Sequence, residues 1–254
     1  MRARLIVGIL VAARVLAAAP LVCAHRHIER SLPQCADPHK GCVRVKLDYV
    51  EVTSGPAPVR SRMNAAILAY LERGDETKLT PEQFANDFIK THRREPHNVP
   101  SDGRELSRTV KLLRATPPVF AFVCDTFAYE GGAHPSSDTR FLNFDARTGE
   151  PVTLASILKE NALPRLAITA EVYFRKARQL TATADLAEEG FRFAGNQFKL
   201  NDTYGIGERE LIFFFNDYEI GPHSMGTTEV KIPYGAIVDL LRPGIVSQKE
   251  NGSK

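Results

Sequence analysis

The chain has 254 residues, and its 33 Lys and Arg against 30 Asp and Glu give a formal net charge of +3. Residues 1–24 contain three of the arginines, Arg2, Arg4 and Arg14, and no acid, so the rest of the chain is neutral, with 30 residues of each sign. A neutral chain lacks the basic footprint on which nucleic-acid binding depends, so we expect no nucleic-acid partner.

Residues 1–24 have the pattern of a signal peptide, with two arginines ahead of an apolar stretch over residues 5–22 that ends in small side chains. Cleavage after Ala24 fits this pattern best, and a cut after Ala19 also fits. Arg14 interrupts the stretch, whereas a membrane span needs roughly 20 predominantly apolar residues. We therefore expect a periplasmic or secreted protein, with membrane contact limited to an uncleaved or lipidated N-terminus.

The cysteines agree with an oxidising compartment. Cys35 and Cys42 flank a short segment with turn-forming Asp-Pro and Gly residues, and we expect them to form a disulfide. Cys124 is then left over in the apolar run 119–124, where a buried free thiol is expected.

The first structural elements follow from local patterns. Apolar residues alternate with charged ones over residues 43–52, which predicts a half-buried strand, and residues 61–73 have helical spacing. Thr80 followed by Pro and, three residues on, by Gln83 predicts a capped helix start. The polar segment 93–103 contains two prolines and is expected to be a loop.

The rest of the chain alternates in the same way, with turns at Gly131-Gly132 and at Thr148-Gly149. It carries no fixed-period repeat. These patterns predict an α+β fold of mixed or antiparallel sheets with packed helices, in two lobes. Strands are expected at residues 105–115, 119–129, 140–145, 210–216 and 228–232, short strands near Phe191 and Phe198, a short helix after Leu154, and helices at 163–179 and 234–241.

We expect an N-terminal lobe over residues 25–115, a second domain over 116–242, and a flexible tail over 243–254. The charge is divided unevenly: residues 25–124 carry 16 basic and 12 acidic side chains, and residues 125–239 carry 11 and 17. The later part is therefore acidic, which would steer a cationic partner towards it.

The most unusual string is Tyr-Glu-Gly-Gly-Ala-His-Pro at residues 129–135. Two glycines after a strand permit positive φ angles, and His134 lies on the resulting turn. This is either a hairpin whose histidine packs locally or a functional loop. Tyr218, Pro222, His223 and Met225 lie in a second loop, and rigid aromatic and proline side chains on loops are typical of protein-binding surfaces.

The second half of the chain resembles the extracytoplasmic domain of unknown function found in RsiV-like anti-sigma factors and PdaC-like peptidoglycan deacetylases. The resemblance runs from about residue 120 to residue 241, and a weaker one covers residues 43–115. The matching positions are 129–135, 143–145, 148–149, Leu154, 198–200, 213–218, Gly226 and 230–234.

In the anti-sigma factors this domain is a receptor for lysozyme, so the resemblance implies an envelope domain that binds lysozyme or a cell-wall component. The chain shows no sigma-binding segment ahead of a span and no deacetylase domain after residue 241, so neither signalling nor deacetylation is carried over. His223 stands where the family commonly has an aromatic residue.

We therefore predict a secreted or periplasmic, non-catalytic binding domain of the cell envelope whose partner is lysozyme or a cell-wall glycan. We expect no catalytic residues, no metal and no cofactor. The candidate binding residues are Tyr129, Glu130, Gly131, Gly132, His134, Pro135, Tyr218, Pro222, His223 and Met225.

The alternative is an envelope enzyme or enzyme accessory acting on peptidoglycan, with His134 and His223 in its site. Two loop histidines could form an acid and base pair or hold a metal if the loops meet. The acids that could join them are Asp125, Asp138, Glu130 and Asp217.

Overall fold

The computed structural model describes residues 20–32, 42–73, 79–94, 103–131 and 133–246. This part of the chain forms two β-sheets and packed α-helices, so the expected α+β class is confirmed. None of its helices combines the length and the apolar composition that a membrane crossing requires.

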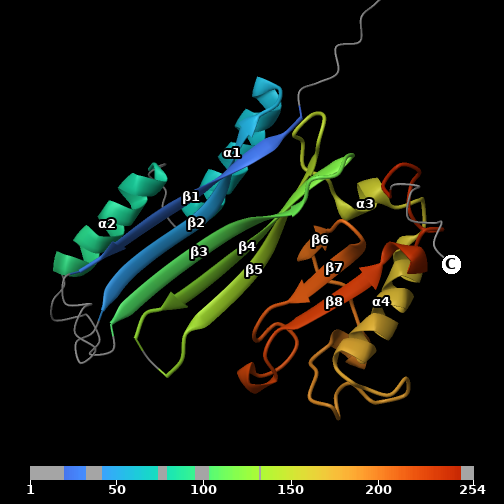
Figure 1. The fold of residues 1–254 in the computed structure, drawn as a ribbon. Helices are drawn as coiled ribbons and strands as arrows, with labels where there is room; N and C mark the ends of the chain where they lie inside the picture. Colours follow the sequence, from blue (N-terminus) through green and yellow to red (C-terminus); the bar gives the residue numbers. More distant parts are fainter. Residues whose placement is uncertain (1–19, 33–41, 74–78, 95–102, 132, 247–254) are drawn as a thin grey trace, which may run out of the picture.

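The first sheet has five strands in the order β1-β2-β3-β4-β5 (Figure 1). Strands β2 and β3 run parallel, and the other neighbours are antiparallel. The second sheet is antiparallel, in the order β6-β7-β8. The strands are β1 (Val22–Ser31), β2 (Val43–Ser54), β3 (Arg104–Arg114), β4 (Val119–Tyr129), β5 (Ser136–Asp145), β6 (Tyr204–Ile206), β7 (Glu210–Phe215) and β8 (Thr228–Pro233).

Helices α1 (Ala57–Leu71) and α2 (Pro81–Arg94) cover one face of the five-stranded sheet. The alternation in β2 explains this, because its odd-numbered residues from Val43 to Tyr49 are buried under the helices. The expected cap of α2 is confirmed: Thr80 and Gln83 exchange hydrogen bonds of 2.8 and 3.2 Å between their side chains and backbone N–H groups.

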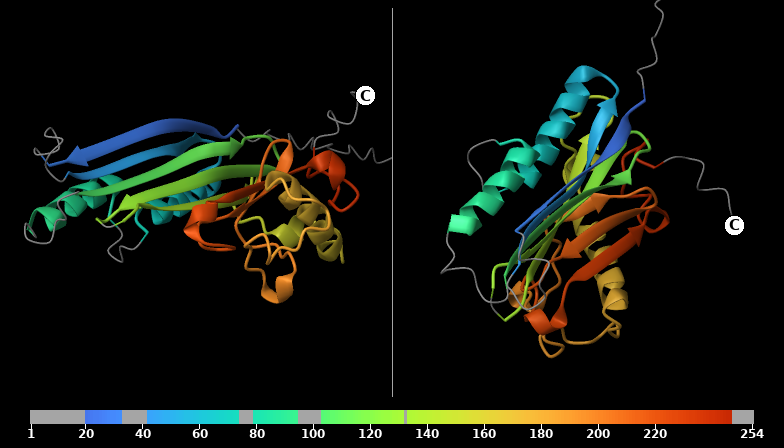
Figure 2. Two further views of the ribbon diagram at one scale, coloured as in Figure 1. Left: turned by 90° about the horizontal axis from the view of Figure 1, so that it is seen from below. Right: turned by 60° about the vertical axis from the view of Figure 1, so that its left-hand side comes forward.

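The second lobe lies on the opposite face of the large sheet (Figure 2). It contains the three-stranded sheet, α3 (Leu154–Ile157) and α4 (Leu163–Ala177), and α4 packs on β8. Strand β4 separates two hydrophobic cores, because Phe120, Phe122 and Cys124 face α1 and α2 whereas Val119 and Ala121 face the second lobe. Burial on both faces explains the continuous apolar run.

Cys124 is a free, fully buried thiol, as predicted, and burial raises its pKa to about 12. Its thiol is therefore protonated at neutral pH. The predicted Cys35–Cys42 disulfide includes Cys35, which lies outside the described residues, so that pairing stays a prediction.

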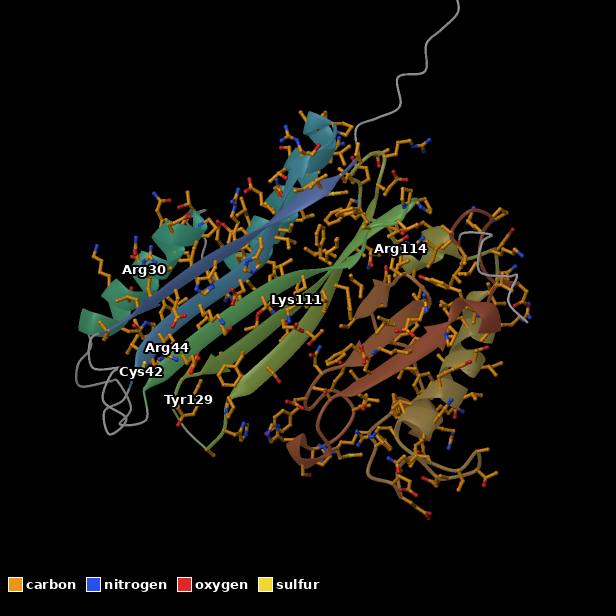
Figure 3. All side chains as sticks on the ribbon, viewed as in Figure 1. Arg30, Cys42, Arg44, Lys111, Arg114 and Tyr129 are labelled. Carbon is orange, nitrogen blue, oxygen red and sulfur yellow. The ribbon has the colours of Figure 1, made fainter. Side chains whose placement is uncertain are left out.

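The expected division at residues 115 and 116 falls between β3 and β4, which are hydrogen-bonded neighbours. The buried Arg114 side chain at this point also reaches into the second lobe (Figure 3). The tail expected from residue 243 is partly packed, since Ile245 and Val246 contact the second core; residues 247–254 lie outside the described residues. The division into two domains stays a prediction.

Two sequence expectations about elements were wrong, and one strand was missed. No strand forms near Phe191 or Phe198, because these rings enter the core from an irregular segment that packs around Phe174. Residues 234–241 form a short 3₁₀ turn and irregular backbone instead of a helix, and Gly235 disfavours a helix there. Strand β1, which overlaps the expected signal peptide, was not foreseen.

Candidate functional site

The two candidate loops meet at one end of the molecule. Asn216, at the end of β7, accepts a hydrogen bond of 2.7 Å from the Thr139 N–H and donates one of 3.1 Å to the Thr139 carbonyl. Its amide therefore pairs with the outer edge of β5 as a neighbouring strand would. Ser137 Oγ donates to Asp217 Oδ2 at 3.3 Å. These bonds fix the loop after β7 against the hairpin that holds residues 129–135.

Three rings gather where the loops meet, and we call His134, Tyr218 and His223 the ring cluster. The two imidazoles stack with centroids 4.2 Å apart and planes 13° apart, and the Tyr218 ring lies 5.4 Å from His223. The Tyr218 hydroxyl is 3.1 Å from His134 Nε2. Three residues that the sequence places on two separate loops thus form one continuous aromatic surface.

The tautomer of neutral His134 follows from its partners. Its Nδ1 lies 2.9 Å from the Pro135 carbonyl, which can only accept a hydrogen bond. The proton is therefore on Nδ1, and Nε2 accepts from the Tyr218 hydroxyl. The Tyr218 hydroxyl is thus directed at His134. The residue as a whole is 61% exposed to solvent.

Tyr218 is held in a conformation that tyrosine rarely adopts, with φ of +65°. It is the third residue of a turn closed by a hydrogen bond of 3.2 Å from the Glu219 N–H to the Asn216 carbonyl. Glu219 in turn accepts from the Asn216 N–H at 2.9 Å and from Asn201 at 2.7 Å. Strain of this kind, on the order of 1–3 kcal/mol, tends to occur at functional sites.

The surroundings of the ring cluster are acidic. Residues 129–139 and 216–226 contain four carboxylates and no Lys or Arg. Asp217 Oδ2 lies 3.7 Å from His223 Nδ1, a buried atom without a hydrogen-bond partner among the described residues. Asp138 is paired with Arg73 and Arg140 at 2.7 and 2.9 Å. Asp217 and Glu219 contact Ser, His and Asn side chains and the Asn216 N–H, with no Lys or Arg partner among the described residues, and their negative charge suits a cationic partner.

The other candidate residues lie around the ring cluster without joining it. Tyr129 and Glu130 border a pocket on the helix side of the first sheet, and Gly131 turns the hairpin with φ of +81°. Pro135 is exposed beside His134, and Pro222 starts the short turn that carries His223. Met225 packs beneath that turn, against the second core. Gly132 lies outside the described residues.

Of the acids considered for catalysis, Asp217 is the one beside a histidine. Asp125 accepts from Thr139 Oγ1 at 2.9 Å, and Asp138 holds two arginines. Within the described ranges, no group of three or more His, Cys, Asp and Glu side chains is arranged to hold a metal ion. Sequence reasoning missed Asn216 and Ser137. Both are polar residues near strand ends, and this pattern is too common to indicate that they join the two loops.

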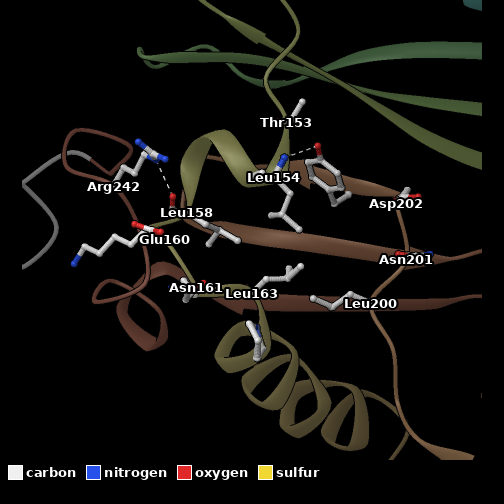
Figure 4. Close-up of a pocket in the computed structure, with 15 residues that line it drawn as sticks. Thr153, Leu154, Leu158, Glu160, Asn161, Leu163, Leu200, Asn201, Asp202 and Arg242 are labelled. Atoms are coloured by element: carbon white, nitrogen blue, oxygen red, sulfur yellow. Dashed lines mark hydrogen bonds between the residues drawn. The ribbon is translucent and has the colours of Figure 1, made fainter. Parts of the chain in front are cut away.

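A separate pocket of about 930 Å³ lies in the second lobe, lined by α3, the start of α4 and residues 200–204 (Figure 4). Leu154, Leu163 and Leu200 contribute apolar walls, and Arg242 donates to the Leu158 carbonyl at 2.7 Å. The pocket shares no lining residue with the ring cluster.

The fold is thus that of an α+β protein with two stacked sheets covered by helices, whose loops carry the candidate site. Residues 155–235 match a family described as "Protein of unknown function (DUF3298)". The chain is 16% identical to a DUF3298-family protein from Bacteroides fragilis NCTC 9343, with a TM-score of 0.70 over 88% of this chain and 94% of that one. The expected resemblance is therefore confirmed, and the shared fold extends beyond the matched segment.

Two curated relatives are similar over parts of the chain. The peptidoglycan-N-acetylmuramic acid deacetylase PdaC of Bacillus subtilis (strain 168) is 22% identical over 179 residues, which are 68% of this chain and 38% of PdaC. Esterase Rv3036c of Mycobacterium tuberculosis (strain ATCC 25618 / H37Rv) is 30% identical over 111 residues, 43% of this chain and 47% of the esterase. The chain spans less than half the length of either relative.

Proposed function

We propose that the chain is an extracytoplasmic, non-catalytic binding protein whose ring cluster, together with the acidic side chains of loops 129–139 and 216–226, binds a cationic protein of the c-type lysozyme class. The observation that carries the proposal is the exposed Tyr218 ring, held at positive φ beside two histidines, in loops that contain four carboxylates and no Lys or Arg. An aromatic anchor in a complementary electrostatic field is a usual centre of a protein interface.

The N-terminal pattern supports export. Strand β1 begins at Val22, and Leu21 and Cys23 pack against the first core. A cut after Ala24 would remove the start of this strand, whereas a cut after Ala19 would leave it whole. We therefore favour the cut after Ala19 in the folded protein. The intact mass of the exported protein distinguishes the two: a chain starting at His25 would contradict this choice.

Calorimetric titration tests the proposal. The exported chain, titrated with a c-type lysozyme at about 50 and about 150 mM NaCl, is expected to give saturable binding that weakens at the higher salt concentration, since surface charges are screened. Cytochrome c, another small cationic protein, serves as the control for binding by charge alone. Absence of heat with lysozyme, or equal binding of cytochrome c, would contradict the proposal.

A cell-wall glycan is the competing partner, because PdaC carries peptidoglycan in its name and because an exposed ring can stack on a sugar. The same titration with soluble muropeptides separates the two: saturable binding of muropeptides without binding of lysozyme would favour the glycan.

An enzyme is the second candidate function. Asp217 near His223, and His134 bonded to Tyr218, form a set of groups able to exchange protons, and the two curated relatives are named a deacetylase and an esterase. Turnover of p-nitrophenyl acetate or of acetylated muropeptides that disappears in His134→Ala, with the fold intact, would replace the binding proposal.

A further inference from the structure

A second site is formed on the helix side of the first sheet, where a pocket of about 330 Å³ lies between α2, the end of α1 and strands β3 and β4. Arg73, Arg104, Arg108 and His92 line it, together with the apolar Phe88. We call it the Arg108 pocket. It shares no residue with the ring cluster.

Arg108 is the centre of this pocket and is 8% exposed. Its two terminal nitrogens donate to the carbonyls of Leu71 and Arg73 at the end of α1, the second bond being 2.7 Å long. The guanidinium carbon lies 5.2 Å from the centre of the Phe84 ring. Nε is buried and has no hydrogen-bond partner in the described part of the chain.

All these partners of Arg108 are neutral groups. The carbonyls at a helix C-terminus and the face of an aromatic ring attract a cation but carry no full negative charge. Burial lowers the pKa of Arg108, and the nearby Arg73 lowers it further, yet a guanidinium stays protonated in proteins. No carboxylate of the described residues forms an ion pair with it, and a buried charge normally requires a partner.

The rest of the lining also contains basic side chains. Arg104 and Arg108 lie on the same face of β3 because side chains alternate along a strand. Glu105 and Glu130 are the two acidic residues of the lining, and the Glu105 side chain is on the opposite face of β3, where its charge acts on Lys46. Arg73 is paired with Asp138, which lies outside the lining.

We propose that the Arg108 pocket binds a small carboxylate that carries an apolar substituent, such as the free carboxyl terminus of a short alanine-ended peptide. Guanidinium groups recognise carboxylates through paired N–H donors. Phe88, Leu106 and Ala128 in the lining provide apolar contact for a methyl group, which inorganic phosphate lacks.

Titration of the full chain with N-acetyl-alanyl-alanine, in its L and D forms, tests this site by nuclear magnetic resonance. The peptide amide and inorganic phosphate serve as the comparison ligands. Saturable binding of at least one free acid is expected, with affinity at least about tenfold lower for its amide because the charge is gone. Equal binding of acid and amide, binding of phosphate without the peptide acid, or no binding at all would overturn the proposal.

Variants locate the site. Arg108→Met removes the bonds to the end of α1 and is expected to impair folding, so Arg104→Met and His92→Ala are the informative changes. Each is expected to weaken binding of the acid about five- to tenfold. Arg165→Met, an exposed arginine on α4, is the matched control and should bind as the parent does. Unchanged affinity in Arg104→Met and His92→Ala together would overturn the assignment to this pocket.

Discussion

Replacing Arg114 by methionine is expected to lower the free energy of unfolding by about 3–5 kcal/mol, because the change leaves buried carbonyl oxygens without donors. Arg114 is 2% exposed. Its nitrogens donate to the carbonyls of Thr116 at 2.8 Å, Gly207 at 3.2 Å and Ile245 at 2.9 Å. One side chain thus connects the end of β3 to two segments of the second lobe.

Urea denaturation followed by circular dichroism measures this change. Lys111→Met, in the same strand but exposed and without a side-chain partner in the described residues, is the matched control and should stay within about 0.5 kcal/mol of the parent. A loss below about 1 kcal/mol in Arg114→Met would show that these bonds do not join the two lobes, since a single unsatisfied buried group already costs about that much.

Replacing Tyr218 by glycine is expected to separate binding from stability. Glycine adopts a φ of +65° without strain, so the free energy of unfolding should stay the same or rise by up to about 1 kcal/mol. The affinity for lysozyme should fall by about 2 kcal/mol or more, roughly thirtyfold, because the exposed ring is the proposed anchor of the interface. Thermal denaturation and calorimetric titration of one preparation give both quantities.

Tyr218→Phe is the control for the hydroxyl. It keeps the stacked ring and removes the hydrogen bond to His134, so affinity should fall by only about 0.5–1.5 kcal/mol. Ile168→Ala, which shortens an exposed apolar side chain on α4, should bind as the parent does. Full affinity in Tyr218→Gly would remove Tyr218 from the interface.

Much of the fold follows from local patterns. The alternation over residues 43–52, the apolar run before Cys124 and the capping pair Thr80 and Gln83 each specify an element without help from distant residues. Helix α1 begins at Ala57, four residues before its expected start, because Pro58 fits the first turn of a helix.

The errors arise where tertiary packing overrides the local pattern. Phe191 and Phe198 occur in patterns that resemble short strands. Their rings are instead buried by contact with Phe174, without any pairing of strands. Strand β1 begins within the expected signal peptide and pairs with β2. No local sequence pattern indicates that pairing.

The two loops of the site were predictable from the sequence, but their contact was not. A Gly-Gly hairpin with His134 and a second loop with Tyr218 and His223 are visible in the sequence. Their contact depends on Asn216 pairing with the edge of β5, which requires both sheets to be in place. The stacked geometry of the ring cluster is therefore a product of the tertiary fold and not of either loop alone.

The most direct test of the proposed surface is hydrogen–deuterium exchange of the exported chain with and without saturating c-type lysozyme. Slower exchange is expected within residues 133–139 and 216–226, with no change along the pocket segment 153–164. Protection of the pocket segment alone, or no protection anywhere in the chain, would contradict binding at the ring cluster.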